Sequence, residues 1–143
     1  RREEQYPKAQ EEQKDAEVEN GNVRMSAVAE NIRQYISAHY KEDISLQSVA
    51  EEMNYSDAYF CKIFKQCFDK SFIVYLTEYR INQAKKLLSD VRINVKDVST
   101  GVGYRDSNYF AKVFKRAVGS TPTEYRMEML KQIEGQQAAG GKE

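Results

Sequence analysis

The sequence predicts an all-α protein in which two copies of a helix, a tight turn and a second helix are joined by one long helix, giving about seven helices. Apolar residues recur at helical spacing through most of the chain, and no alternating run bounded by turn residues indicates a strand. Gly and Pro, which weaken or break helices, are rare, at 7 and 2 of 143 residues. In addition, the stretch 44–76 is repeated at 93–126. These three observations predict the fold class.

Polar composition at both ends of the chain sets the expected limits of the folded body. Residues 1–24 contain almost no apolar side chains, so they cannot bury enough surface to offset chain entropy. We expect a polar linker or arm there, and a flexible tail at 132–143. The body between them, 25–131, divides in order into a first unit at about 25–70, a linker helix at 71–90 and a second unit at about 91–131.

Capping residues divide the first unit into three helices. A first helix is expected to end near Tyr40. Ser45 can cap a second helix, and Ser56 or Asp57 can cap a third that runs to about Phe68, because short polar side chains accept hydrogen bonds from the first N–H groups of a helix. The positions expected to face the core on the first two helices are Val28, Ile32, Tyr35, Ile36, His39, Leu46, Val49, Ala50 and Met53.

The same signals define the long helix and the second unit. A helix with one apolar sector is expected from Ser71 to Ser89, and Asn94 opens the next helix. Asp106 caps a sixth helix that ends near Val118. The letters TPTE at 121–124 form a capping box with proline at the first helical position, which predicts a seventh helix. The apolar sector of the long helix is expected to contain Ile73, Leu76, Ile81, Ala84, Leu87 and Leu88.

The repeat places the same kind of helix after each turn. The motif Tyr-Phe-x-Lys-Ile-Phe-Lys at 59–65 matches Tyr-Phe-x-Lys-Val-Phe-Lys at 109–115, with one residue added at Ser107. At about 100° per residue, the apolar side chains of each helix lie on one side. The residues expected to face inward are Phe60, Ile63, Phe64 and Cys67 in the first copy, and Phe110, Val113, Phe114 and Ala117 in the second. The outward residues, none of them acidic, are Ala58, Cys61, Lys62 and Lys65, and then Ser107, Asn108, Ala111, Lys112 and Lys115.

These outward faces fit the major groove of double-stranded DNA. A helix, a tight turn and a steeply crossing second helix can place that second helix in the groove. Small residues allow close approach to the bases, Asn can bind adenine, and Lys can reach guanine. Cations beside the faces suit phosphates, which set orientation rather than sequence choice. The residues expected to contact phosphates are Ser56, Lys65, Arg105, Lys115 and Arg116.

Charge and composition narrow the class of function. The chain is neutral, with 22 Lys and Arg against 22 Asp and Glu, but residues 56–131 hold fourteen basic and eight acidic side chains. A local positive excess favours contact with a polyanion, although a solvated helical surface can produce the same sum. With one His and two Cys, the sequence has no nucleophile-base pair, metal-ligand set or glycine-rich phosphate loop. We therefore expect no enzymatic activity, no cofactor and no metal.

Several residues are expected to serve packing rather than chemistry. His39 lies on an apolar stripe without a second ligand at metal-binding spacing. Arg80, within the apolar stripe of the long helix, is expected to reach an acid or backbone carbonyls. Tyr59 and Tyr109 are expected in the core, and Cys61 either touches a base or is merely small. The two units are expected to be closed by Tyr75 and Tyr125.

The stretch from about Ile32 to Arg126 resembles the DNA-binding domain of the AraC/XylS family of bacterial transcription regulators. The most specific match is DVSTGVGYRDSNYFAKVFKR at 97–116, continued by GSTPTEYR at 119–126. The resemblance implies two major-groove helices on one face of the duplex, about 34 Å apart and held by the long helix. It also implies base contacts by Ala58, Cys61, Lys62, Ser107, Asn108, Ala111 and Lys112.

Three positions depart from the family pattern. Asn54 and Asp69 stand where Gly is common, and Ser99 stands where Ala is usual. Asn tolerates a positive φ, so Asn54 is a mild change. Because the first outward face has fewer hydrogen-bond donors than the second, we expect the second unit to supply more of the sequence discrimination.

The letters Asn-Tyr-Phe at 108–110 and the short polar segment before the domain are most similar to the YesN-type response regulators. This implies a sequence-specific DNA-binding module at the C-terminal end of a two-component response regulator. A receiver or sensor domain then lies outside this chain, which begins with Arg1 rather than Met. Double-stranded DNA is the expected partner and RNA polymerase a further candidate.

We also expect a cytoplasmic protein that does not contact membranes, because no apolar run is long enough to span one. The alternative function is a helical protein-protein interaction module for an acidic partner, which would use the same outward faces.

Overall fold

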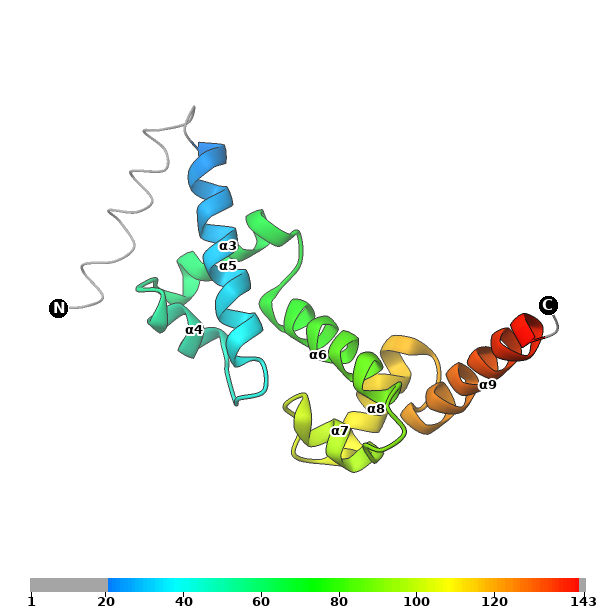
Figure 1. Ribbon diagram of the computed structural model, residues 1–143. Helices are drawn as coiled ribbons and strands as arrows, with labels where there is room; N and C mark the ends of the chain where they lie inside the picture. Colours follow the sequence, from blue (N-terminus) through cyan, green and yellow to red (C-terminus); the bar gives the residue numbers. More distant parts are fainter. Residues whose placement is uncertain (1–20, 142–143) are drawn as a thin grey trace. The chain divides into compact units, whose positions relative to one another are not determined.

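The computed structural model describes residues 21–141, and within them the chain folds into helices joined by short turns, without a strand (Figure 1). The expected all-α fold class is confirmed. The helices are α3 (Gly21–His39), α4 (Leu46–Glu52), α5 (Asp57–Phe68), α6 (Phe72–Leu88), α7 (Val95–Gly101), α8 (Ser107–Val118) and α9 (Pro122–Gly141).

The two outer helices extend beyond the expected folded body. Helix α3 begins at Gly21, inside the segment expected to be a polar arm, and the rest of that segment lies outside the described residues. Helix α9 continues to Gly141, through most of the segment expected to be a flexible tail. The Gln, Glu and Ala residues of that segment favour a helix and Pro is absent from it, whereas its three Gly residues do not favour a helix.

Four helices begin at the capping residues that the sequence predicts. Backbone N–H groups donate to Ser45 Oγ at 3.1 Å, to Ser56 Oγ at 3.2 Å and to Asn94 Oδ1 at 2.8 Å. Asp106 Oδ1 accepts from two N–H groups, at 2.9 and 3.3 Å. Of the two candidates for the cap of α5, Ser56 is the N-cap and Asp57 is the first helical residue. These caps fix where each helix starts, because they satisfy N–H groups that have no partner within the helix.

The capping box before α9 is also present. The backbone N–H of Glu124 donates to Thr121 Oγ1 at 3.1 Å, and the backbone N–H of Thr121 donates to Glu124 Oε1 at 2.9 Å. Pro122 is the first residue of the helix and is buried. These hydrogen bonds hold the pKa of the Glu124 carboxyl below its usual value.

The chain forms two compact units that divide between Thr77 and Glu78, within α6. In the first unit, an aromatic cluster forms the core. The ring of Phe64 lies 5.7 Å from that of Phe60 and 5.7 Å from that of Phe72, centroid to centroid. Tyr75 closes the cluster as expected, with its ring edge-on to Phe64 at 5.4 Å. Both α3 and α4 pack against α5.

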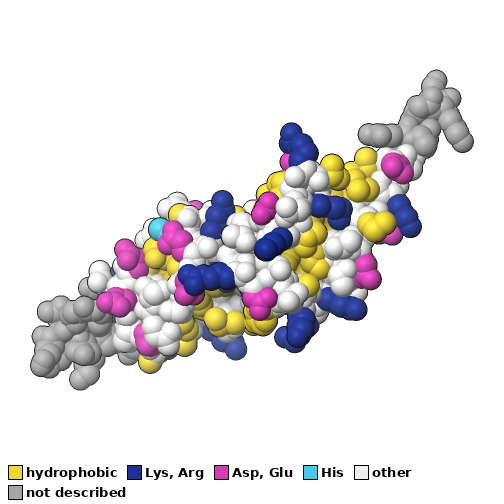
Figure 2. Space-filling model, turned by 90° about the horizontal axis from the view of Figure 1, so that it is seen from below, with side chains coloured by type: hydrophobic (Ala, Val, Ile, Leu, Met, Phe, Trp, Pro, Cys, Tyr) yellow, Lys and Arg dark blue, Asp and Glu magenta, His cyan; other side chains and the backbone are white. Residues whose placement is uncertain are grey.

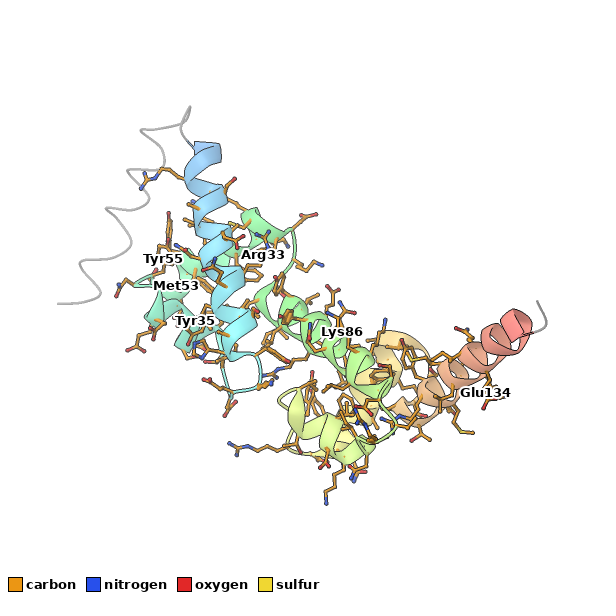
Figure 3. All side chains as sticks on the ribbon, viewed as in Figure 1. Arg33, Tyr35, Met53, Tyr55, Lys86 and Glu134 are labelled. Carbon is orange, nitrogen blue, oxygen red and sulfur yellow. The ribbon has the colours of Figure 1, made fainter. Side chains whose placement is uncertain are left out.

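His39 is a packing residue, as predicted. Its ring stacks on that of Tyr35 at a centroid distance of 4.2 Å, and its Nδ1 lies 2.9 Å from Glu42 Oε2. Tyr35 lies on α3 (Figure 3), and His39 follows it by one helical turn on the same helix. The stack stabilises the C-terminal end of α3, where the chain turns toward α4.

The core of the second unit repeats the first around Phe110 and Phe114, which are fully buried. Tyr125 closes this unit, with its ring edge-on to Phe114 at 5.5 Å. Arg80 lies with its guanidinium carbon 5.3 Å from the ring centroid of the buried Tyr104. This cation–π contact was not predicted from the sequence, and the expected contact of Arg80 with an acid or a carbonyl stays a prediction.

Arg126 makes contacts with backbone carbonyls of the kind that the sequence predicts for Arg80. Its Nε donates to the carbonyl of Leu88 at 2.8 Å, and its Nη2 donates to the carbonyls of Asp90 and Ile93 at 3.1 and 2.6 Å. Arg126 thereby ties α9 to the end of α6 and to the loop before α7. Beside it, the Arg92 guanidinium holds the pKa of the Asp90 carboxyl at about 2.

The prediction of one apolar sector along α6 was wrong. Ile73 was expected to face inward, but its side chain is 60% exposed, and Phe72 is buried instead. The buried residues of α6 fall on two sides of the helix at about 100° per residue. Phe72 and Leu76 form one group, and the other group consists of Ile81, Ala84 and Leu88.

We predict that Asp69→Gly raises the free energy of unfolding by about 0.5 to 1 kcal/mol, because Asp69 ends α5 at a φ of 58°, which glycine adopts without a Cβ clash. Urea unfolding followed by circular dichroism measures the change.

The matched control is Gly119→Ala at the equivalent end of α8, where φ is 100° and an added Cβ meets no atom within 4 Å. We expect Gly119→Ala to lower the free energy of unfolding by about 1 to 2 kcal/mol, because a Cβ strains a backbone in the left-handed region. A decrease in stability for Asp69→Gly would contradict the prediction.

Candidate nucleic-acid interface

Two turns of the same geometry lead into α5 and α8, the helices with the predicted outward faces. In the first unit, the N–H of Tyr55 donates to the carbonyl of Ala50 at 2.9 Å. In the second unit, the N–H of Tyr104 donates to the carbonyl of Ser99, also at 2.9 Å. The sequence repeat is therefore a structural repeat, with each turn closed by the same backbone hydrogen bond.

Each turn needs one residue in the left-handed region. Asn54 has a φ of 64° and Gly103 a φ of 103°. Because Asn is among the residues that tolerate this region, the first turn forms without glycine, as the sequence predicts. Met53 and Tyr55 flank Asn54 between α4 and α5 (Figure 3). Burial raises the pKa of the Tyr55 hydroxyl in this turn.

Burial fixes which side of each helix meets solvent. Phe60 and Phe64 of α5 are fully buried, as are Phe110 and Phe114 of α8. Residues on the opposite side of a 3.6-residue helix must then point outward. The exposed residues among those predicted to contact DNA are Ala58, Cys61, Lys62, Lys65, Arg105, Asn108, Lys112, Lys115 and Arg116. The half-buried ones are Ser56, Ser107 and Ala111.

The first outward face, on α5, has few groups that can donate a hydrogen bond. Lys62 and Lys65 supply its cations, and Cys61 adds an exposed free thiol. Asp57 is exposed at the first position of the helix, where its negative charge interacts favourably with the positive end of the helix dipole. The outward residues themselves contain no acid, but a carboxylate borders the face at this end.

The second outward face, on α8, is richer in donors. Asn108 and Lys112 are exposed one helical turn apart, and Lys115 and Arg116 follow in the last turn. The nearest acid on this helix is Asp106, whose carboxylate accepts two backbone hydrogen bonds as the N-cap. This face therefore combines an amide, small side chains and three cations.

Lys and Arg side chains protrude from the surface with Asp and Glu side chains among them (Figure 2). The whole chain has equal numbers of basic and acidic residues. A polyanion would therefore be attracted by particular helix faces rather than by a uniformly positive surface.

Two residues of α8 that were expected to face inward are exposed. Tyr109 is 57% exposed, whereas its counterpart Tyr59 is 4% exposed, and Ala117 is exposed where its counterpart Cys67 is half-buried. The difference lies in the neighbours, since α3 and α4 pack on α5, whereas α7 and α9 pack on α8. Cys67 Sγ, for example, lies 3.8 Å from the carbonyl oxygen of Met25 in α3.

Ser99 has a structural role in the second turn that the sequence did not reveal. Its side chain is fully buried, and its Oγ donates to the carbonyl of Tyr104 at 2.9 Å. The equivalent residue of the first unit is the buried Ala50. The serine thus adds a second hydrogen bond between Ser99 and Tyr104, across the turn that leads into α8.

Within residues 21–141, no cluster of three or more His, Cys, Asp or Glu side chains is arranged to hold a metal ion. No helix of this part of the chain combines the length and apolar character that crossing a membrane requires. The two cysteines are free thiols.

A family model described as a helix-turn-helix domain matches residues 49–128. The C-terminal domain of the two-component response regulator yesN from Fusobacterium nucleatum is similar, with a TM-score of 0.68 and 31% identity over 70% of this chain and 98% of that chain. The chain belongs to the AraC/XylS family. It is an AraC-type helix-turn-helix DNA-binding domain of transcription regulators, and the interaction module for an acidic partner is not favoured.

Other matches agree with this assignment. The HTH-type transcriptional regulator YijO of Escherichia coli is 34% identical over 77% of this chain and 39% of that protein. The DNA-binding domain of AdpA, solved in complex with a target DNA, has the same fold, with a TM-score of 0.69 and 22% identity over 73% of this chain and 94% of that chain. The AraC-type chain spans only 36–40% of the length of the first curated relatives.

We predict that Ser99→Ala lowers the free energy of unfolding by about 1 kcal/mol, because it removes a buried hydrogen bond to the carbonyl of Tyr104. Thr100→Ala is the matched control, since the Thr100 hydroxyl is exposed and bonds a carbonyl of its own helix at 3.3 Å. The control should change stability by less than about 0.5 kcal/mol. Equal effects of the two substitutions in thermal unfolding would contradict the role of Ser99.

Proposed function

We propose that this domain binds double-stranded DNA with sequence specificity, with α5 and α8 each entering the major groove. The observation that carries the proposal is the pairing of a fully buried phenylalanine side with an exposed polar side on both helices. A recognition helix needs both, because one side must hold it to the unit while the other reaches the bases. The AraC-type family and the DNA complex of AdpA support the choice of DNA as partner.

The second unit is proposed to make most of the sequence-specific contacts. The Asn108 amide can donate to and accept from adenine, and the Lys112 ammonium can donate to guanine O6 and N7. Ser107 and Ala111 are small and half-buried, so the backbone of α8 can come close to the base edges. In the first unit, the corresponding roles fall to Ala58, Cys61 and Lys62.

The phosphate contacts are proposed to come from residues beside these faces. Lys65, Arg105, Lys115 and Arg116 are exposed and carry the charge. Ser56 Oγ accepts the N–H of Tyr59, and its hydroxyl hydrogen remains able to donate to a phosphate. Such contacts set the register and the salt dependence of binding without reading sequence.

The domain is further proposed to be the output part of a bacterial two-component response regulator. Its similarity to the C-terminal domain of yesN and its partial coverage of the curated relatives support this. The remaining part of such a protein would supply the receiver or sensor, and the protein would act in the cytoplasm on the chromosome. No chemical step is required, because placing the protein at a promoter is sufficient to influence RNA polymerase, the second proposed partner.

We predict that Lys112→Ala weakens binding to the preferred DNA sequence by about 1 to 3 kcal/mol and brings it closer to the affinity for scrambled DNA. Asn108→Ala should act in the same direction, because it too removes a contact with a base edge. Fluorescence-anisotropy titrations on a sequence selected from a random pool, and on its scrambled version, measure both affinities.

Arg116→Ala provides the contrast for this prediction. It should weaken both DNAs alike and reduce the slope of log affinity against log salt by about one. Wild-type behaviour of all three variants, or binding of the wild-type chain that is insensitive to salt, would contradict the proposal and favour a protein partner.

A further inference from the structure

Tyr109 differs in burial from the residue at the same position of the repeat in the first unit. An exposed aromatic side chain on its own needs no explanation. Here, however, the repeat provides a direct comparison, because Tyr59 occupies the same position of the same motif and is 4% exposed, against 57% for Tyr109. The second unit therefore presents to solvent a large amphipathic side chain that the first unit buries.

The position of Tyr109 on α8 places it beside the second outward face. Lys112 and Arg116 follow it by three and seven residues, so the three side chains lie along one edge of the helix. Both cations are exposed. Asn108, which is proposed to contact a base, is the preceding residue and lies about 100° around the helix. Tyr109 thus occupies the border between the reading face and its phosphate-binding side.

The ring of Tyr109 lies against a buried aromatic ring of the second unit. The Tyr109 ring lies 6.0 Å from that of Tyr104, centroid to centroid, and Tyr104 is buried. Tyr104 is in turn contacted by the guanidinium of Arg80 at 5.3 Å and by the ring of Phe110 at 5.6 Å. The Tyr109 ring therefore rests on a packed layer, which reduces the conformational entropy that it loses when a partner binds.

We propose that the Tyr109 hydroxyl donates a hydrogen bond to a phosphate of the DNA at the edge of α8, as a positioning contact. This inference rests on the proposed function. Tyrosine hydroxyls are among the groups that bind DNA phosphates, and a hydrogen bond to a charged oxygen is stronger than one between neutral groups. Arg116, which is proposed to contact a phosphate from the same edge, would hold the phosphate backbone within reach of this hydroxyl.

Tyr109→Phe tests the proposal, because it removes the hydroxyl and keeps the ring on Tyr104. Affinity for the selected sequence and for its scrambled version should each fall by about tenfold, so that their ratio stays the same. The slope of log affinity against log salt should stay unchanged, because a neutral side chain displaces no counterion. This combination separates Tyr109 from the cation Arg116, whose loss lowers the slope.

Tyr59→Phe is the matched control, since it makes the same chemical change at the buried counterpart, and DNA affinity should stay at the wild-type value. Thermal unfolding of both variants reports whether either change acts through stability. Wild-type affinity of Tyr109→Phe, or a changed ratio between the two DNAs, would overturn the phosphate contact while leaving the proposed function intact. Absence of DNA binding by the wild-type chain would instead refute the proposed function.

Discussion

Two pairs of phenylalanine rings, each pair one helical turn apart, determine which side of α5 and α8 meets solvent. Phe60 and Phe64 are fully buried in the first unit, and Phe110 and Phe114 are fully buried in the second. Burial of one such ring is worth about 1.5 to 3 kcal/mol. Rotating either helix to hide its polar side would expose both rings. The outward faces are therefore a consequence of packing, and the side chains on them are free to vary with the DNA sequence to be read.

The turns before these helices act together with the buried rings. The rings fix the rotation of each helix about its own axis, and the turn with its N-cap fixes where the helix begins. Asn54 and Gly103 provide the left-handed residue, and Ser56 and Asp106 provide the caps. Because the first turn of a recognition helix is the part nearest the bases, the cap decides which residues can reach them. The buried Ser99 hydroxyl strengthens the turn of the unit that carries more hydrogen-bond donors.

Features that depend on neighbouring residues in the sequence could be predicted, and features that depend on distant neighbours could not. Caps and helical periodicity are local, so the helix starts at Ser45, Asn94 and Asp106 were predicted correctly, and Ser56 was one of the two candidates for the start of α5. The prediction that Tyr109 is buried failed because the motif is repeated in the sequence but its surroundings are not repeated in the fold. The helices that pack on α8 differ from those that pack on α5. The carbonyl contacts of Arg126 join segments far apart in the chain, and no periodic pattern indicates them. The roles of the outward residues toward DNA stay predictions.

The central proposal is that α5 and α8 each enter the major groove of double-stranded DNA, for which the family resemblance implies consecutive stretches on one face of a single duplex. A hydroxyl-radical footprint of this chain on its selected DNA site tests that claim most directly. We predict two protected segments on the same face of the duplex, with centres about one helical turn, or 10 base pairs, apart. A single protected segment, or two segments on opposite faces of the duplex, would contradict it.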